Sequence, residues 1–172
     1  MKIKLIPSIL IIIFCIIFLI FYKGLQNSNV YVPKNNIEID IPAFNAKLFD
    51  TDEEILSEEI FKTNEFYFMN IWSSWCIPCR EEHQFLINLG SQENIEIIGL
   101  NYKDKNENAK KFLKEFNNPF KLIISDIDGI IAIEWGAIGV PESFLIYNKK
   151  IIKKIVGPLD ENSLLEIKKI IQ

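Results

Sequence analysis

The stretch Cys76-Ile-Pro-Cys79 constrains this chain more than any other feature of its sequence. It follows an uncharged, aromatic-rich run at residues 66–72, which predicts a buried strand. The residues after Cys79 read as a helix, so the two cysteines lie where a strand ends and a helix begins. Side chains three residues apart in a helix share one face, within reach of a disulfide. Pro78 suits the first helical turn, because the N–H that it lacks had no partner there.

The two thiols are expected to play different roles because they occupy different places in the helix. Cys76 falls at the helix N-terminus, where unpaired N–H groups and the macrodipole favour a thiolate. Cys79 lies one turn inside and is expected to be more buried. The pair therefore predicts an attacking thiol, Cys76, and a resolving thiol, Cys79, for thiol–disulfide exchange.

Part of a metal site is the alternative interpretation of the same residues. His83 comes four residues after Cys79 and could share a face with both cysteines. Structural zinc usually needs four ligands, however, and the only other cysteine, Cys15, is far away near the N-terminus. Redox chemistry is thus the favoured interpretation, and neither a metal nor another cofactor is expected. His83 is otherwise expected to lie on the surface of the helix.

Three blocks of sequence resemble one known family when they are taken together and in order. The blocks are Asn70-Ile-Trp-Ser-Ser-Trp-Cys-Ile-Pro-Cys-Arg-Glu-Glu-His-Gln84, Gly99-Leu-Asn-Tyr-Lys-Asp104 and Gly139-Val-Pro-Glu-Ser-Phe-Leu-Ile146. They are similar to the membrane-anchored, periplasmic thiol:disulfide interchange proteins of cytochrome c biogenesis (DsbE/CcmG type), within the thioredoxin superfamily. A Cys-x-x-Cys pair alone is weakly specific, whereas three blocks in order are a strong signal. The resemblance covers roughly residues 40–170.

The resemblance implies a substrate groove around the cysteine pair. Pro141 is cis in this family and lies opposite the cysteines, and a cis bond before proline costs little. That geometry leaves the backbone of Val140 free to pair with an extended substrate segment. Trp75 is expected to border the same groove and to pack beside Cys76. From the residues alone, a trans proline that opens a strand is the favoured interpretation of Pro141, and the resemblance reverses this preference.

Two acids are expected to tune the pKa values of the cysteines, because similar acids line the groove in the family. Glu82 shares the helix face of Cys79, and Glu142 follows the proline. A carboxylate near the pair opposes thiolate formation and could accept the proton of Cys79. Thioredoxin carries a buried Asp six residues before its first cysteine. Asn70 stands there in this chain, so the role of that acid is not carried over to it.

The pattern of apolar residues along the rest of the chain predicts an α/β sandwich of three layers on a central mixed sheet. The resemblance makes this sandwich thioredoxin-like. A net charge of −4 and the lack of a basic stripe argue against nucleic acid as a partner. Strands are predicted at residues 41–49, 66–72, 95–101, 122–124, 143–147 and 151–156, and helices at residues 56–61, 76–89, 106–116, 130–135 and 160–171.

The N-terminal residues 1–23 predict one transmembrane helix. The run Leu5–Tyr22 is apolar except for two residues and reaches the lower range of lengths for a membrane span. A cleaved signal peptide is the alternative, but no Ala-x-Ala-like site follows the run. Basic residues at positions 2 and 4 favour a cytoplasmic N-terminus. Residues 24–40 then form a tether, and residues 41–172 form the domain.

These observations together predict a protein disulfide reductase of the bacterial inner membrane, single-pass, with its catalytic domain in the periplasm. The resemblance implies apocytochrome c or a cytochrome c maturation protein as substrate, and a membrane thiol carrier of the CcdA/DsbD type as electron donor. Arg80 follows Cys79, so the chain has no haem-attachment motif of its own. Two rivals stay open: a general periplasmic reductase for other disulfides, and a metal-binding carrier that uses the cysteine pair with His83.

Overall fold

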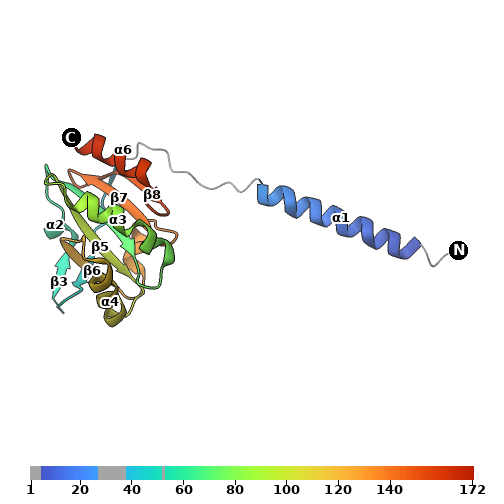
Figure 1. The fold of residues 1–172 in the computed structure, drawn as a ribbon, viewed down its shortest axis with the longest axis horizontal. Coiled ribbons are helices and arrows are strands. Elements are labelled where there is room, and N and C mark those ends of the chain that lie inside the picture. Colours follow the sequence, from blue (N-terminus) through green and yellow to red (C-terminus); the bar gives the residue numbers. More distant parts are fainter. Residues whose placement is uncertain (1–4, 27–37, 52) are drawn as a thin grey trace. The chain divides into compact units, whose positions relative to one another are not determined.

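The computed structural model describes residues 5–26, 38–51 and 53–172. The chain divides into two compact units, Met1–Pro33 and Lys34–Gln172. The first unit contains helix α1 (Leu5–Gln26) (Figure 1). Among the residues with described coordinates, no helix is both long and apolar enough to span a membrane. The transmembrane helix expected from the sequence is therefore not confirmed.

Two segments of the predicted anchor and tether lie outside the described residues. The basic start at Lys2 and Lys4 lies outside the described residues. So do residues 27–37, which make up most of the predicted tether. The division of the chain into anchor, tether and domain stays a prediction.

The second unit alternates strands and helices, as the sequence predicts. Its strands are β1 (Ile39–Asp40), β2 (Asn45–Leu48), β3 (Glu54–Leu56), β4 (Phe66–Trp72), β5 (Ile95–Tyr102), β6 (Leu122–Asp126), β7 (Glu142–Tyr147) and β8 (Lys150–Val156). Its helices are α2 (Ser57–Ile60), α3 (Ile77–Gly90), α4 (Asn106–Phe116), α5 (Ile130–Glu134) and α6 (Glu161–Ile171).

The eight strands form one mixed sheet in the order β1-β8-β7-β4-β5-β6-β2-β3. The central pairs β4–β5 and β5–β6 are parallel, and every other pair of neighbours is antiparallel. The first two strands lie at opposite sides of this sheet, since β1 pairs with β8 and β2 pairs with β6. The N-terminal part of the domain therefore supplies the strands at both edges.

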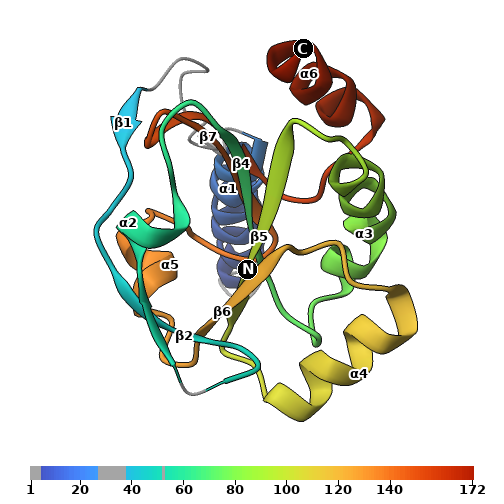
Figure 2. The ribbon, with the colours of Figure 1, turned by 90° about the vertical axis from the view of Figure 1, so that its left-hand side faces the viewer.

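Helices cover both faces of the sheet and complete the three layers (Figure 2). Helices α3, α4 and α6 pack on one face, where Leu86, Phe112 and Ile167 belong to a single core cluster. Helices α2 and α5 pack on the other face, with Ile60 and Ile131 in a second cluster. The predicted three-layer α/β sandwich is confirmed.

The central strand β4 divides its side chains between these two cores. Phe68 and Trp72 belong to the α3 face, whereas Met69 and Ile71 belong to the α5 face. A strand covered on both faces needs apolar residues at nearly every position, which explains why Asn70 alone interrupts the apolar run at residues 66–72. Gly99 on β5 leaves room for this packing, because a Cβ there would lie 2.9 Å from Phe120 and from Trp72 Nε1.

The region before β4 differs from the prediction. One strand was expected over residues 41–49, but the chain forms a hairpin of β2 and β3, with an antiparallel register of Ala46 opposite Ile55. Ser57 was expected to cap the following helix. Instead it is the first residue of α2, and its Oγ accepts a hydrogen bond from Phe44 N at 3.3 Å. Three-residue strands such as β3 carry too few residues to show an alternating pattern.

Candidate active site

The two cysteines form a disulfide at the point predicted from the sequence, between β4 and α3. Their Cα atoms lie 5.3 Å apart. Cys76 is the N-cap residue of α3, and its Sγ accepts a hydrogen bond from Cys79 N at 3.1 Å. Cys79 is not clearly the more buried of the two, since the residues are 3% and 2% exposed. Both cysteines belong to the core cluster on the α3 face of the sheet, which explains their similar burial.

The loop before Cys76 is held by the carboxylate of Asp104. Asp104 accepts hydrogen bonds from Ser74 N at 2.6 Å and from Ser74 Oγ at 2.8 Å. Arg80 on α3 donates to the Ser74 carbonyl oxygen at 3.1 Å. Trp75 remains 56% exposed, and its indole N–H donates to the Lys103 carbonyl oxygen. The loop is therefore fixed by its backbone while the Trp75 ring faces outward beside the disulfide.

Glu82 is fully buried under the first turns of α3. Its Oε1 accepts a hydrogen bond from Asn70 Nδ2 on β4 at 2.8 Å. Its Oε2 accepts one from Leu159 N, in the loop before α6, at 2.8 Å. Asn70 Nδ2 also donates to Ser143 Oγ on β7 at 2.9 Å. One carboxyl group thus joins α3, the central strand and the loop that leads into α6.

Burial raises the pKa of Glu82 to about 7, and the hydrogen bonds from Leu159 and Asn70 oppose this rise. No lysine or arginine in the described parts of the chain forms an ion pair with it. Glu82 lies three residues after Cys79, on the same side of α3. It can therefore exchange a proton near neutral pH close to the resolving thiol. Its effect on the cysteine pKa values stays a prediction.

The Val140–Pro141 bond is cis, as the resemblance implied. Pro141 is buried and directly precedes β7. Val140 packs against the core cluster that contains both cysteines. Just before it, Ile138 is 77% exposed. The loop therefore runs from the surface at Ile138 to the core cluster that contains the cysteine pair.

Glu142 is the second predicted acid, and it lies on the opposite face of the sheet from Glu82. It shares its side of β7 with Phe144, in the core beneath α5, whereas Ser143 faces Asn70. Its Oε1 accepts hydrogen bonds from Ile138 N at 2.7 Å and Gly139 N at 3.0 Å. The predicted influence of Glu142 on the cysteine pKa values stays untested. The contacts show a carboxylate that holds the loop before Pro141.

His83 is buried, so its expected place on the helix surface was wrong. It is 1% exposed, and its Nε2 donates to the Asn117 carbonyl oxygen at 2.8 Å. The ring of Phe112 meets it edge-on, with centroids 5.0 Å apart. Burial lowers the pKa of His83, and the bond to Asn117 opposes this. Helix α4 covers this side of α3, which no local pattern in the sequence indicates.

The surface hollow of about 640 Å³ lies apart from the disulfide. It opens between β2, the end of β6 and α5, and its lining includes Lys47, Asp128 and Ile130. Neither cysteine, nor Trp75, nor Pro141 lines it. The exposed surface next to the cysteine pair is thus the ring of Trp75, and this hollow is separate from it.

Several residues around the site received no role from the sequence. Asp104 stands in the second resembling block, yet nothing in its spacing shows that it reaches the loop of the first. Leu159 and Lys154 lie in the last third of the chain, and only the fold brings them to Glu82 and Glu142. The sequence offered a signal for Asp104 alone, because it is an acid within one of the three resembling blocks.

Comparison with known proteins agrees with this geometry. The sequence profile of the Redoxin family matches residues 38–170. The chain is 36% identical over 150 residues to the thiol:disulfide interchange protein DsbE of Pseudomonas fluorescens biotype C, covering 87% of this chain and 83% of the relative. It is 43% identical over 99 residues to the thiol:disulfide interchange protein CycY of Rhizobium leguminosarum bv. viciae, covering 57% of this chain and 53% of the relative.

A solved structure shares the fold. The crystal structure of a putative thiol:disulfide interchange protein DsbE from Chlorobium tepidum superposes with a TM-score of 0.66 at 23% identity, covering 77% of this chain and 94% of that one. At this identity the likeness establishes the thioredoxin-like fold alone. The disulfide at the start of α3 and the matches in sequence add the chemistry. The chain therefore belongs to the Redoxin family, as a thiol–disulfide oxidoreductase of the DsbE type.

Proposed function

We propose that this oxidoreductase works as a reductant in cytochrome c maturation, with apocytochrome c or a maturation protein as its substrate. The observation that carries the direction of the reaction is the buried carboxyl of Glu82, without a cation, on the helix face of Cys79. A carboxylate there disfavours a thiolate nearby. A pair whose thiolate form is not stabilised is a weaker oxidant and hence a better reductant.

The reaction uses the two cysteines in turn. In the reduced enzyme, the Cys76 thiolate attacks one sulfur of a substrate disulfide, forming a mixed disulfide and releasing the other substrate sulfur as a thiolate. Cys79 then loses its proton and attacks the sulfur of Cys76. This forms the Cys76–Cys79 disulfide and releases the second substrate thiolate. Two electrons pass to the substrate, and the enzyme is left in the oxidised form that the structure contains.

Glu82 accepts the proton of Cys79 in this proposal. A base works best when its pKa lies near the working pH. Burial raises the pKa of Glu82 to about 7, so the group is partly ionised at neutral pH and can take up a proton. Asn70 and Leu159 hold the carboxyl in place by donating to its two oxygens. The acid thereby occupies a fixed position beneath the resolving cysteine.

A reductase domain outside the cytoplasm needs a source of electrons to reduce its Cys76–Cys79 disulfide again. A periplasm kept oxidising cannot return electrons to the cysteine pair. We therefore include a membrane thiol carrier of the CcdA/DsbD type as the donor. Anchoring by residues 1–23 in the inner membrane, with residues 41–172 in the periplasm, would keep the domain near that carrier. Support for the anchor is the apolar run Leu5–Tyr22 in the sequence.

The anchor is tested by a periplasm-active reporter fused after Gln172. Reporter activity in the membrane fraction, with the chain at full length, is expected. A shortened, soluble mature chain that begins near Gly24 would remove the anchor from the proposal. The reductase chemistry would stand in either case.

The substrate is tested by trapping. In a Cys79→Ala variant, Cys76 still attacks but the mixed disulfide cannot be resolved from within, so a reductant-sensitive covalent complex accumulates. Cys76→Ala is the matched control and should trap little. Recovery of apocytochrome c or a maturation protein supports the proposal, whereas many unrelated proteins would favour a general reductase. Equal trapping by both variants would contradict the assigned roles.

The metal-carrier rival is tested on the same protein. Reduced, purified chain is examined for bound metal, with His83→Ala as comparison. An equimolar metal lost with His83 would favour the carrier. The Nε2 of His83 is already bonded to the Asn117 carbonyl oxygen, which favours the redox interpretation.

A further inference from the structure

The segment Gly136–Pro141 joins α5 to β7, and Val140 near its end packs against the core cluster that contains both cysteines. It has little apolar packing of its own, because Gly136, Ile138 and Gly139 are exposed. A loop of this kind needs fixed contacts to keep one shape. Its shape matters because an extended substrate pairs with backbone groups, which have to be at the correct spacing.

Glu142 fixes the loop from its C-terminal side. Its Oε1 accepts hydrogen bonds from both Ile138 N and Gly139 N, so two successive backbone amides point at one carboxylate oxygen. The Glu142 side chain is 2% exposed, and a buried carboxylate is costly unless it is paired. The loop geometry therefore depends on the contacts of one buried side chain.

Lys154 on β8 supplies the pairing charge. Its Nζ lies 2.8 Å from Glu142 Oε2 and donates to the Gly136 carbonyl oxygen at 2.7 Å. Its side chain is only 15% exposed and passes over the ring of Phe144, with Nζ 5.4 Å from the centroid. Lys154 and Phe144 are direct partners in the β7–β8 register. One ammonium group thus holds the first residue of the loop and neutralises the acid that holds its middle.

We propose that Lys154 and Glu142 form a positioning pair that shapes the Gly136–Pro141 loop for an extended polypeptide substrate. The inference rests on the proposed function, since it concerns substrate recognition by the same disulfide. Neither residue takes part in the exchange of electrons. Both act through the loop backbone, from the α5 face of the sheet.

A specific consequence separates this role from simple structural support. A substrate that pairs with the Val140 backbone needs the correct loop, whereas a small disulfide needs only access to the Cys76 sulfur. Loss of Lys154 should therefore slow the reaction with a polypeptide disulfide and leave the reaction with a small disulfide unchanged.

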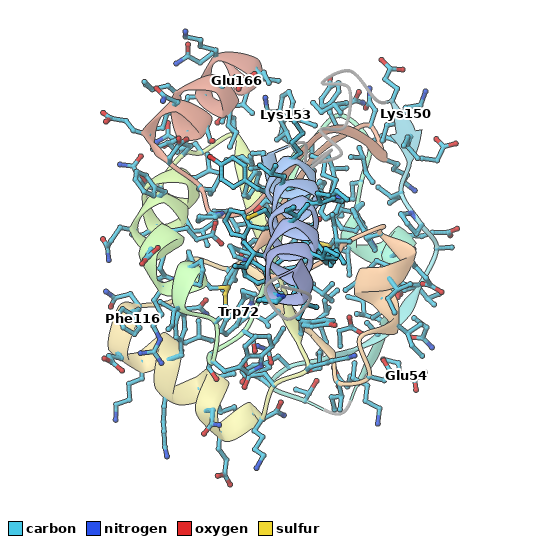
Figure 3. The ribbon with its side chains drawn as sticks, turned by 90° about the vertical axis from the view of Figure 1, so that its right-hand side faces the viewer. Glu54, Trp72, Phe116, Lys150, Lys153 and Glu166 are labelled. Carbon is cyan, nitrogen blue, oxygen red and sulfur yellow. A yellow bond between two sulfur atoms is a disulfide. The ribbon has the colours of Figure 1, made fainter. Side chains whose placement is uncertain are left out.

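The adjacent residue offers a matched control. Lys153 lies next to Lys154 on β8, but it points to the opposite face and pairs with Glu166 on α6 (Figure 3). Its side chain is 10% exposed, so the two lysines are similarly covered. Lys153→Met removes a similarly covered lysine and its ion pair from the same strand without touching the loop, although the partner Glu166 is 58% exposed and Glu142 only 2%.

The experiment uses the full chain, reduced with dithiothreitol, and two oxidants. One is a synthetic peptide with a single internal disulfide and several residues on either side, and the other is the small aromatic disulfide dithiobisnitrobenzoate. In each reaction the enzyme dithiol becomes the Cys76–Cys79 disulfide and the probe becomes two thiols. Second-order rate constants are measured for wild type, Lys154→Met, Lys154→Arg and Lys153→Met.

We expect Lys154→Met to slow peptide reduction about tenfold, because the reacting groups are displaced, and to leave the small disulfide within about twofold. Lys154→Arg should restore the peptide rate, and Lys153→Met should keep it. Equal rates for Lys154→Met and wild type, or an equal fall with both probes, would overturn the inference. If Lys154→Met does not fold, Lys154→Gln is measured in its place, with the same selective loss expected.

Failure of the proposed function looks different. A wild-type chain that reduces the small disulfide but no peptide disulfide would overturn that function, and this inference with it. A wild type that reduces the peptide, with no selective loss in either variant, would overturn the positioning pair alone.

Discussion

Glu82 and Glu142 are both buried at the same end of the sheet, but on opposite faces, and their surroundings differ in one respect. Glu142 has the ammonium of Lys154 at 2.8 Å, whereas Glu82, among the described residues, accepts hydrogen bonds from neutral donors only. Burial raises the pKa of Glu82 to about 7. Burial alone therefore does not decide what a carboxyl group does. The carboxyl group beside a lysine holds a loop, and the one bonded to neutral donors can gain and lose a proton near neutral pH.

Asp104 gives an intermediate case. It holds the loop before Cys76 by its backbone, as Glu142 holds the loop before Pro141. Asp104 is half-buried, whereas Glu142 is buried. The loops before Cys76 and Pro141 are thus each fixed by a carboxylate. Within the described parts of the chain, only the deeper of the two carboxylates, Glu142, forms an ion pair with a lysine.

A second carboxylate beside Glu82 should produce the largest change in the free energy of unfolding. Asn70→Asp places an acid at the position of the amide that lies 2.8 Å from Glu82 Oε1. Two acids so close cannot both ionise, so one must hold its proton at neutral pH. We expect the free energy of unfolding at pH 8 to fall by about 3 to 5 kcal/mol, with a smaller loss at pH 4. Equal losses at the two pH values would contradict a shared proton.

Removal of the charge at Glu82 should produce the second largest effect, a change in how stability depends on pH. Because its pKa is raised from 4.5 to about 7, the folded chain binds this proton more tightly than the unfolded chain does. Stability from this group is full below pH 4.5 and is lost as the pH rises through about 7. Wild type should lose about 3 kcal/mol across this window, and Glu82→Gln should lose little of it. Urea denaturation of the oxidised protein measures this, and parallel pH profiles would refute the assignment.

Loss of charge at Asp104 tests the intermediate case. Each carboxylate oxygen of Asp104 accepts a backbone N–H, that of Ser74 on one and that of Lys105 on the other. Asp104→Asn turns an amide N–H toward one of these two donors, so at least one of the two bonds fails. We expect a loss of about 1 to 2 kcal/mol in the free energy of unfolding. Asp50→Asn is the control, because Asp50 makes only an exposed ion pair with Lys110, worth less than about 1 kcal/mol. Similar losses in both variants would deny Asp104 a special role.

Ser143→Ala should have the smallest effect on the free energy of unfolding. It tests the Glu82 face of β7 without changing Glu142 on the other face. Ser143 Oγ accepts from Asn70 on the Glu82 side, while its neighbour Glu142 faces Lys154. Losing this neutral hydrogen bond should cost about 1 kcal/mol. The pH dependence of stability should stay as in wild type, because Asn70 still donates to Glu82. A changed pH dependence would show that the network acts as one titrating unit.

The fold was predictable where a single helix or strand is long enough to show its own pattern of apolar residues. The predicted helix at residues 106–116 and strand at residues 66–72 coincide with α4 and β4. In α4 a single apolar face repeats with the helical period, and in β4 every position is covered. The hairpin of β2 and β3 was missed because each strand is too short to show a period. Its pairing with β6 follows from the tertiary fold.

The site was predictable only in part, for the same reason. The cysteines and Pro141 lie in compact blocks, so the sequence identifies them. The environment of Glu82 depends on Leu159, which is 77 residues away. His83 is buried because α4 supplies Phe112 and Phe116 around its ring. Spacing along a helix gives the face of a side chain, but not what the rest of the chain places on that face.

The arrangement of the edge strands has a consequence for the order of folding. The first strand to be synthesised, β1, finds its partner only in the last one, β8, with Ile39 opposite Ile151. The ribosome must therefore release almost the whole domain before this edge can close. Pairings between distant parts of a chain form slowly. A chain that stops before Lys150 leaves β1 and β7 without their common neighbour, and such unpaired edges readily join other chains.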